Sequence, residues 1–533
     1  MLLYLASRGP LLPLGFGNDS DAWSVAANAK ALALEHEYRP SRFPGHPFHE
    51  CLYSLAIASG GALASNLLSL TLSIGLLIVV SRLGSRLRVP HTAWALVAIA
   101  VHPLVWVTSA DSTDFILAAL LGTSALLAAT MEKDGWAGLL LGLAGATRPE
   151  SLLFIMPLLC LASRVRWTRL ALAAALTLSV SYLPVILFYR RAPVPLWTVN
   201  IASLAPKLRL LIFAAGLWAG WGLLGGLVLV LLLLAHRRGL RDRWSRRDPL
   251  LLAVASLLGT YVIVTAMHPS KATYLVPVIP LLMLGLAGLA STRWRVALAT
   301  ALLSYAFVYP HFLDRGPAGL RLGFKWNNGI VVKDFIAKWN NAHAAAVIEN
   351  SRPRGRSVVV LGYWLPMWRY AHQEAVPVTN LPSGAPLDSR YNAAFRTSDG
   401  ALVFHNLALS EAQQTVADGT PLLFAEGIDQ FMREVHGYEI EGVGGRKIRV
   451  RELGTEVAEH FTLPVLVRCV WEPGPWVGCV QPVRGDDRVS RISPLGSREE
   501  QSRAGVGMRY SSVSTALART ADDGRQVLFE AGP

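Results

Sequence analysis

Long apolar blocks alternate with short polar loops over the first part of the chain. Through about residue 315 these blocks consist mostly of Leu, Ala, Val and Gly, and most approach the ~20 residues that a helix needs to cross a bilayer. From about residue 316 the apolar positions become scattered among polar ones. The pattern predicts an α-helical polytopic membrane domain over 1–315, followed by a soluble C-terminal domain.

The individual membrane spans follow from the lengths of the apolar blocks. They are expected at roughly 60–82, 91–108, 112–131, 170–189, 208–234, 249–267, 273–290 and 296–313. The block 136–162 differs, because it holds the polar residues Thr147 to Glu150 at its centre, where charge is costly in a bilayer. Two short helices that meet at Pro149 avoid this cost. With a short first helix over 1–16, about eleven spans are expected, half-spans included.

The polar part contains two predicted regions. Residues 316–455 alternate helix-like runs such as 327–350 with strand-like runs such as 357–371, which predicts a small α/β domain. Residues 456–533 have little periodicity and are expected to form a polar tail. Within it, Cys469 and Cys479 flank a Pro-Gly turn, and a disulfide between them is expected if the two arms pair in the right register.

Composition and charge support this division and set the orientation. The chain of 533 residues is 52% hydrophobic and 16% charged, with a net charge of +14. The arginines cluster in loops at 82–88, 164–169, 236–248 and 293–295, and alternation of the spans places all four loops on one side. The positive-inside rule makes that side the cytoplasm, so the charge does not indicate a nucleic-acid partner. The C-terminal domain then lies outside the cytoplasm, on an inner-membrane protein.

The same topology gathers ionisable residues on the outer face. These are Asp19, Asp21, His46, Glu50, Asp111, Asp114, Arg148, Glu150 and Lys271. Simpler structural explanations exist for several of them: Asp19 can cap a surface helix, Asp111 at an N-cap with Asp114 in the first turn can cap a span, and Lys271 can snorkel to the interface.

Two further features of the outer face leave alternatives open. The proline-rich stretch 38–50 is either a plain re-entry loop or a stiffened functional loop; His46 and His49 lack further ligands at the spacing of a zinc site. Arg148 needs an anionic partner, for which Glu150, Asp111, Asp114 or a bound phosphate are candidates. The loop 190–209 is expected outside although it carries cations, including Arg190 and Arg191.

The order of the motifs resembles the GT-C superfamily of membrane glycosyltransferases. The similarity is greatest to the branch of the protein O-mannosyltransferases and the bacterial aminoarabinose transferase. "DSDAW" at 19–23 resembles the branch's acidic motif in its first external loop, and "RFPGHPFHE" at 42–50 stands in place of its "PPL" turn. "GLLLGLAGATRPESLLFIMPLL" and "KATYLVPVIPLLMLGLA" resemble its later segments. Ser20 stands where the branch has a second acidic residue.

The resemblance implies transfer of a sugar from a polyprenyl-phosphate carrier to a glycan, lipid or protein acceptor. Asp19 is expected to be the general base, with Asp21 as the other catalytic candidate. Cations are expected to stabilise the leaving phosphate. The expected substrate-binding residues are His46, Glu50, Asp111, Asp114, Arg148, Glu150 and Lys271. No cofactor is expected, and metal dependence stays open.

Functions of other classes also fit a polytopic chain. A transporter or lipid-carrier flippase places its ionisable residues near the bilayer midplane and often contains repeats. A non-catalytic scaffold has no need for carboxylates and cations that converge outside one helical bundle. The absence of a repeat in the sequence and the gathering of charges on one face favour the glycosyltransferase over both.

Overall fold

The structure is a computed structural model of the whole chain, and it describes most residues before 406. The described residues are 2–36, 38–42, 44–162, 165–189, 206–267, 272–316, 319–349, 357–378, 394–405, residue 420 and six short strands beyond it. Lys271, which is expected to bind substrate, and the loop cations Arg190 and Arg191 lie outside this part of the chain.

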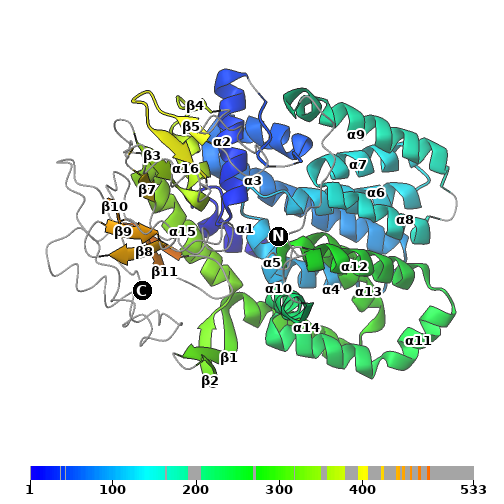
Figure 1. The fold of residues 1–533 in the computed structure, drawn as a ribbon. Helices are drawn as coiled ribbons and strands as arrows, with labels where there is room; N and C mark the ends of the chain where they lie inside the picture. Colours follow the sequence, from blue (N-terminus) through cyan, green and yellow to red (C-terminus); the bar gives the residue numbers. More distant parts are fainter. Residues whose placement is uncertain are drawn as a thin grey trace. The chain divides into compact units, whose positions relative to one another are not determined.

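Helices make up the first three hundred residues (Figure 1). The short N-terminal helices are α1 (Leu2–Arg8), η1 (Gly9–Leu11) and α2 (Ser20–Glu35). They are followed by α3 (Pro47–Arg86), α4 (Thr92–Val101), α5 (Pro103–Thr108), α6 (Phe115–Thr130), α7 (Asp134–Thr147), η2 (Pro149–Phe154), α8 (Ile155–Leu161), α9 (Trp167–Tyr189), α10 (Pro206–Ala235), α11 (Arg237–Ser245), α12 (Pro249–Met267), η4 (Ala272–Val278), α13 (Ile279–Leu289) and α14 (Thr292–Phe307).

Several of these helices have the length and composition of membrane spans. Within the described residues, Pro47–Arg86, Trp167–Phe188 and Ala272–Leu289 are long and apolar enough to cross a bilayer, and four helices of 10 to 17 residues are apolar but shorter. The apolar end of α10 is followed by α11 after a bend of 64°. The chain is therefore an integral membrane protein, while the total of about eleven spans stays a prediction.

The helix boundaries confirm one prediction and correct two others. The predicted break near Pro149 is present, because α7 ends at Thr147 and η2 begins at Pro149. The predicted span 91–108 is two helices: α4 ends before His102, whose side chain accepts the Leu104 N–H and so caps α5. The predicted span 296–313 is also wrong at its end, because α14 ends at Phe307 and a strand follows.

Glycines allow the central helices to approach closely. α7 packs against α6 and α9, and α3 packs against α6 (Figure 1). A Cβ atom on Gly138 would lie 2.2 Å from the Leu170 carbonyl oxygen, and one on Gly142 would lie 2.7 Å from the Ala174 carbonyl oxygen. This G-x-x-x-G spacing puts both glycines on the face of α7 that meets α9, as in tightly packed membrane helices.

The chain divides into two compact units. The first contains residues 1–17, 31–311 and 325–335, and the second contains 18–30, 312–324 and 336–533. The apolar helices belong to the first unit. The start of α2, with Asp19 and Asp21, belongs to the second. The predicted domain boundaries at 315 and 455 stay predictions.

The second unit contains the larger sheet. Its strands are β3 (Val358–Val360), β4 (Val376–Pro377), β5 (Ala394–Arg396), β6 (Leu402–Phe404) and β7 (Leu422–Phe424), in the order β4-β5-β6-β3-β7. β3 is parallel to β6 and β7 and is buried at all three residues, which explains its unbroken valine run. The chain enters this unit through α15 (Ile330–Glu349), and η5 (Gly362–Trp364) and α16 (Leu365–Ala371) follow β3.

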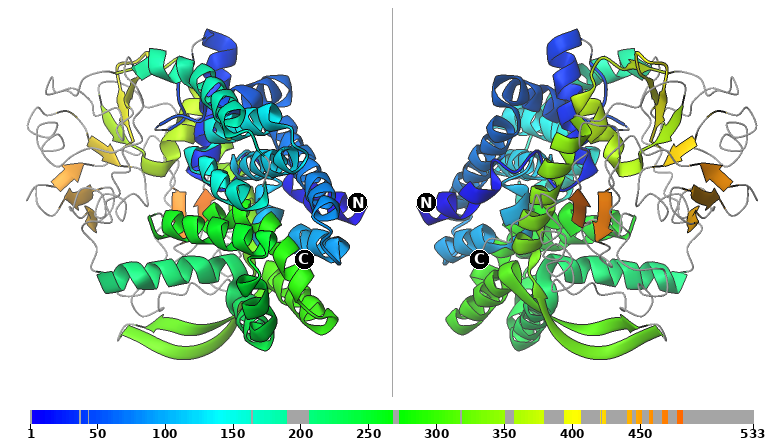
Figure 2. Two further views of the ribbon diagram at one scale, coloured as in Figure 1. Left: turned by 90° about the vertical axis from the view of Figure 1, so that its right-hand side faces the viewer. Right: turned by 90° about the vertical axis from the view of Figure 1, so that its left-hand side faces the viewer.

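Smaller sheets complete the described strands. β1 (Val308–Gly316) and β2 (Gly319–Asn328) form the long two-stranded ribbon in Figure 2. The others are β8 (Ile440–Val443), β9 (Lys447–Val450), β10 (Glu456–Ala458), β11 (Leu466–Cys469) and β12 (Val477–Val480).

The pairing of β11 with β12 bears on the expected disulfide. The two strands are antiparallel, with Cys469 opposite Val477 and Cys479 opposite Val467. The cysteines are therefore diagonal neighbours, at a typical separation of roughly 7–8 Å, whereas disulfides usually join residues with Cα atoms about 4.4–6.8 Å apart. The predicted pairing of the two arms is present, but this register does not favour the disulfide.

Candidate functional site

Three of the predicted outer-face residues, Asp114, His46 and Arg148, meet in the first unit together with Arg42, around the buried carboxylate of Asp114. Asp114 Oδ2 lies 2.5 Å from Arg42 Nη2 and 3.1 Å from His46 Nδ1, and Asp114 Oδ1 lies 2.6 Å from Arg148 Nη1. We refer to these four residues as the Asp114 cluster. Asp114, Arg148 and His46 are buried, and Arg42 is partly exposed. The cluster joins the proline-rich stretch, the start of α6 and the break after α7.

The position of Asp114 explains why it meets so many partners. It is the residue before α6, at the N-cap position, yet its side chain makes no capping hydrogen bond and turns to the two arginines instead. Asp111 is not the N-cap that the sequence suggested: its Oδ1 accepts hydrogen bonds from the N–H and the hydroxyl of Thr113, which closes a tight turn before the helix. The two aspartates therefore have different structural roles.

The hydrogen bonds of His46 fix its tautomer. Its Nδ1 lies 2.6 Å from the Thr147 carbonyl oxygen and 3.1 Å from the Asp114 carboxylate, and both of these atoms are acceptors. Nδ1 must therefore carry the proton. Since Thr147 is the last residue of α7, this imidazole ties the proline-rich stretch to the helix break.

Arg148 is held by aromatic rings as well as by charge. It lies in extended conformation between α7 and η2, where Pro149 prevents continuation of the helix. Its guanidinium carbon is 4.1 Å from the ring centroid of Phe115 and 4.6 Å from that of Tyr274. Glu150 Oε1 is 3.7 Å from Nη2. The sequence left Glu150, Asp111, Asp114 and a phosphate open as partners, and the structure shows Asp114 as the hydrogen-bonded one.

Glu50 organises the proline-rich stretch. Its Oε1 accepts hydrogen bonds from the Ser41 N–H, at 2.7 Å, and from the Ser41 hydroxyl, and its Oε2 accepts one from the Tyr38 hydroxyl. Gly45 is held separately, because its carbonyl oxygen accepts a hydrogen bond from Tyr182 on α9. Glu50 was predicted to bind substrate; these contacts show a carboxylate that fastens a loop to the start of α3.

Two side chains near the cluster have buried polar atoms without a partner among the residues that the structure describes; the sequence considered His49 only as a zinc ligand and predicted Glu150 as a substrate-binding residue. His49 has no exposed surface, and neither of its ring nitrogens has a hydrogen-bond partner in the described part of the chain; its ring centroid lies 4.1 Å from that of Tyr53. Glu150 Oε2 is likewise buried and lacks a partner among the described residues. Buried polar atoms are usually satisfied, so these three atoms are exceptions within the described part of the chain.

The predicted catalytic aspartates lie in the second unit, at the start of α2. Asp19 Oδ1 accepts the Asp21 N–H at 3.1 Å, so that Asp19 caps the helix. Both side chains are partly exposed. Trp23, the last residue of the motif 19–23, is only 3% exposed and packs edge-on against Tyr370, with centroids 6.1 Å apart. Capping explains the position of Asp19 and is compatible with a further role for its carboxylate.

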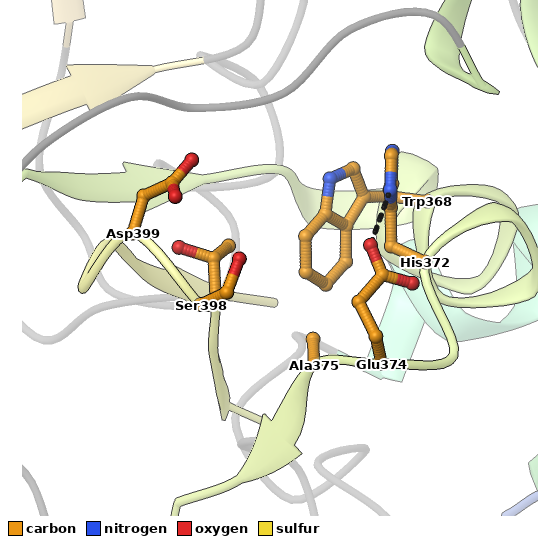
Figure 3. A pocket seen from close by; sticks show the side chains of 7 residues that line it. Trp368, His372, Glu374, Ala375, Ser398 and Asp399 are labelled. Atoms are coloured by element: carbon orange, nitrogen blue, oxygen red, sulfur yellow. Dashed lines mark hydrogen bonds and ion pairs between the residues drawn. The ribbon is translucent and has the colours of Figure 1, made fainter.

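A separate small pocket lies in the second unit (Figure 3). It is lined by Trp368, His372, Glu374, Ala375, Thr397, Ser398 and Asp399. His372 Nδ1 lies 3.3 Å from Glu374 Oε1, and Trp368 is almost completely buried as part of the wall. None of the residues singled out from the sequence lines this pocket.

Comparison with known proteins found little similarity. No family model and no curated protein sequence matches the chain. Among solved structures, it is similar to the crystal structure of ArnT from Cupriavidus metallidurans in the apo state, with a TM-score of 0.46 and 15% identity, over 82% of this chain and 95% of that chain. Likeness at this level does not by itself assign a fold or an activity.

Proposed function

We propose that this protein is a membrane glycosyltransferase that transfers a sugar from a polyprenyl-phosphate-linked donor to an acceptor outside the cytoplasm. The observation that carries the proposal is the Asp114 cluster, where two arginines and an imidazole N–H surround one carboxylate at a break between apolar helices. Buried ionisable groups in a membrane protein are costly and indicate a functional site. The motif order of the GT-C superfamily supports the same activity.

The chemistry of the reaction matches these residue types. The bond between the sugar C1 atom and the phosphate oxygen breaks, a bond forms between C1 and the acceptor oxygen, and the acceptor proton passes to a carboxylate. The lipid phosphate leaves as an anion, which positive charge stabilises. Arg148 donates one hydrogen bond, to Asp114, and among the described residues its other N–H groups have no such partner. Arg148 thus keeps capacity for a phosphate oxygen.

Asp19 is proposed as the general base that accepts this proton. Its substitution by Asn preserves an oxygen that can cap α2 but removes the ability to take up a proton. Asp19→Asn should reduce turnover by about 10²–10⁴-fold while the melting temperature stays unchanged. The matched variant Asp21→Asn should remain active. The reverse result would transfer the role to Asp21, and activity in both variants would exclude either aspartate as the base.

The reaction itself can be tested by mass analysis of cell-envelope glycans, lipids and glycoproteins with and without the gene. Loss of one sugar from a defined acceptor is expected in the deletion strain, and restoration is expected with the wild-type chain but not with Asp19→Asn. The buried charges would also suit a transporter. Unchanged covalent masses together with an altered distribution of a lipid carrier between the leaflets would favour that alternative.

The proposed orientation has a separate test. Topology reporters placed in the loop 236–248 and after residue 350 should report the cytoplasm and the outside, respectively, since the arginine-rich loops are expected to stay inside. Reports from the same side at both points would contradict the orientation, and with it the outer-face location of the reaction.

A further inference from the structure

The arginine-rich helix α11 has a surface that neither the fold nor the proposed reaction uses. It belongs to the first unit and connects α10 with α12, at the edge of the helices in Figure 1. The segment 236–248 carries six arginines and two aspartates. The bend of 64° after α10 turns α11 away from the direction of the preceding apolar helix.

One arginine and one aspartate of the segment are occupied by contacts within the protein. Arg243 Nη2 donates to the Gly288 carbonyl oxygen at 2.6 Å, near the end of α13, and Arg243 Nη1 lies 3.7 Å from Asp248. Asp248 also caps α12 by accepting the N–H groups of Leu250 and Leu251. These contacts fix the orientation of α11, so its remaining side chains point in defined directions.

The opposite side of α11 presents arginines around an exposed tryptophan. Arg237, Arg241 and Trp244 follow the i, i+4, i+7 spacing, which places them on one stripe of a helix. Both arginines are exposed and Trp244 is 55% exposed. The other exposed arginines of the segment are Arg238, Arg246 and Arg247. None of these five has an ion-pair partner within the described part of the chain.

We propose that α11 is a binding surface for anionic phospholipid headgroups of the membrane in which the protein resides. Guanidinium groups bind phosphate through paired N–H donors, and a tryptophan at the headgroup level anchors a helix that lies along the interface. Basic clusters directly adjoining a membrane helix attract anionic lipids by about 1 kcal/mol for each arginine. A free phosphate would use the charges but not the exposed indole beside them.

Lipid selectivity of the purified full-length protein tests the surface. Native mass spectrometry would count phosphatidylglycerol and phosphatidylcholine retained from equimolar mixtures. The wild type should prefer phosphatidylglycerol, and the triple variant Arg237→Gln/Arg238→Gln/Arg241→Gln should weaken that preference by about fivefold for each arginine. The matched control Arg82→Gln/Arg88→Gln/Arg293→Gln removes three exposed arginines of other loops and should keep most of it. High salt should abolish the preference by screening.

The indole provides a second readout. In vesicles that contain brominated phosphatidylglycerol, part of the tryptophan fluorescence should be quenched, and Trp244→Phe should remove that part. Equal loss of selectivity in the two triple variants would show a diffuse charge effect and overturn the proposal, as would quenching that Trp244→Phe leaves unchanged. A wild type without preference for phosphatidylglycerol would also overturn it. Neither measurement depends on glycosyltransferase activity, so failure here leaves the proposed function untouched.

Discussion

The Asp114 cluster and helix α11 are two arginine-bearing regions of the same unit with opposite surroundings. In the cluster, Arg148 is buried and is held by a carboxylate 2.6 Å away and by two aromatic rings. On α11, five arginines are exposed and have no ion-pair partner within the described residues. Burial requires a partner for each charge, because an unpaired ion in an apolar interior costs many kcal/mol. An exposed guanidinium group stays available to bind an anion outside the protein.

This difference gives the two regions different sensitivities to substitution. In the cluster, substitution of one residue leaves the charge of another buried and unpaired, so the free energy of unfolding is expected to fall. On α11, the neighbouring side chains stay in contact with solvent or headgroups after a substitution, so lipid affinity is expected to change and stability is not. Substitutions that separate stability from binding therefore test the comparison directly.

The largest effect is expected at Asp114. Asp114→Ala leaves both Arg148 and Arg42 without their carboxylate, and breaking a buried ion pair typically costs about 3–5 kcal/mol. Arg148→Met should cost less, because Asp114 keeps its contacts with Arg42 and His46. Chemical denaturation of the purified protein in detergent would compare the two. Equal losses, or a greater loss in Arg148→Met, would contradict the central position assigned to Asp114.

A smaller loss is expected at Glu50. Glu50→Gln replaces one carboxylate oxygen by an amide nitrogen that cannot accept the hydrogen bond from Ser41 or Tyr38. A polar group left unpaired in this way costs about 1–3 kcal/mol. Asp242→Asn, at an exposed position on α11, is the matched control and should be neutral. If Glu50 bound substrate and had no role in the loop, Glu50→Gln would lower activity without lowering the melting temperature.

The buried Lys333 provides a pH-dependent test of the rule that burial disfavours the charged form of a side chain. Its Nζ donates to the Tyr309 hydroxyl at 2.8 Å, and burial lowers its pKa from 10.5 to about 6. Between these values the unfolded chain holds a proton that the folded chain lacks, so stability rises with pH by up to about 1.4 kcal/mol per unit. Lys333→Met should flatten this rise in thermal melts from pH 6 to pH 9. An unchanged slope would assign the pH dependence to other groups.

The smallest effect is expected on α11. Arg241→Gln should change the free energy of unfolding by less than about 0.5 kcal/mol in a zwitterionic detergent, because surface substitutions away from specific contacts are nearly neutral. Arg243→Gln should cost more, since it loses the bond to the Gly288 carbonyl oxygen. Denaturation of both variants under the same conditions would show whether α11 is divided into an anchoring side and an exposed side.

Much of the helical architecture could be predicted because it depends on local sequence. The lengths of the apolar blocks located most helices, and Pro149 located the break in the block 136–162. The misplaced boundaries have local causes that hydropathy does not report. His102 and Pro103 interrupt an apolar run with a cap, and the run after Phe307 continues as a strand although its hydropathy suits a helix.

The candidate site was predicted only in its residue types and its common face. The sequence identified Asp114, Arg148, His46 and Glu50 as unusual, because charged and imidazole groups are expensive beside apolar helices. It listed Glu50 and Asp111 as substrate-binding residues, which stays a prediction; the structure shows that Glu50 also holds a loop and that Asp111 closes a turn and is not the N-cap of the helix. It gave no weight to His49 as a buried polar group, since nothing local distinguishes a paired histidine from an unpaired one.

The sequence by itself determined that the chain crosses a membrane, where its helix breaks and which loops carry the arginines, because these properties follow from transfer energies and backbone constraints of neighbouring residues. Only the tertiary structure decided that Arg148 pairs with Asp114, thirty-four positions earlier, rather than with Glu150 beside it. The choice depends on how α6 and α7 pack and on the aromatic rings that hold the guanidinium. Partners that are distant in sequence are set by packing, which no local pattern encodes.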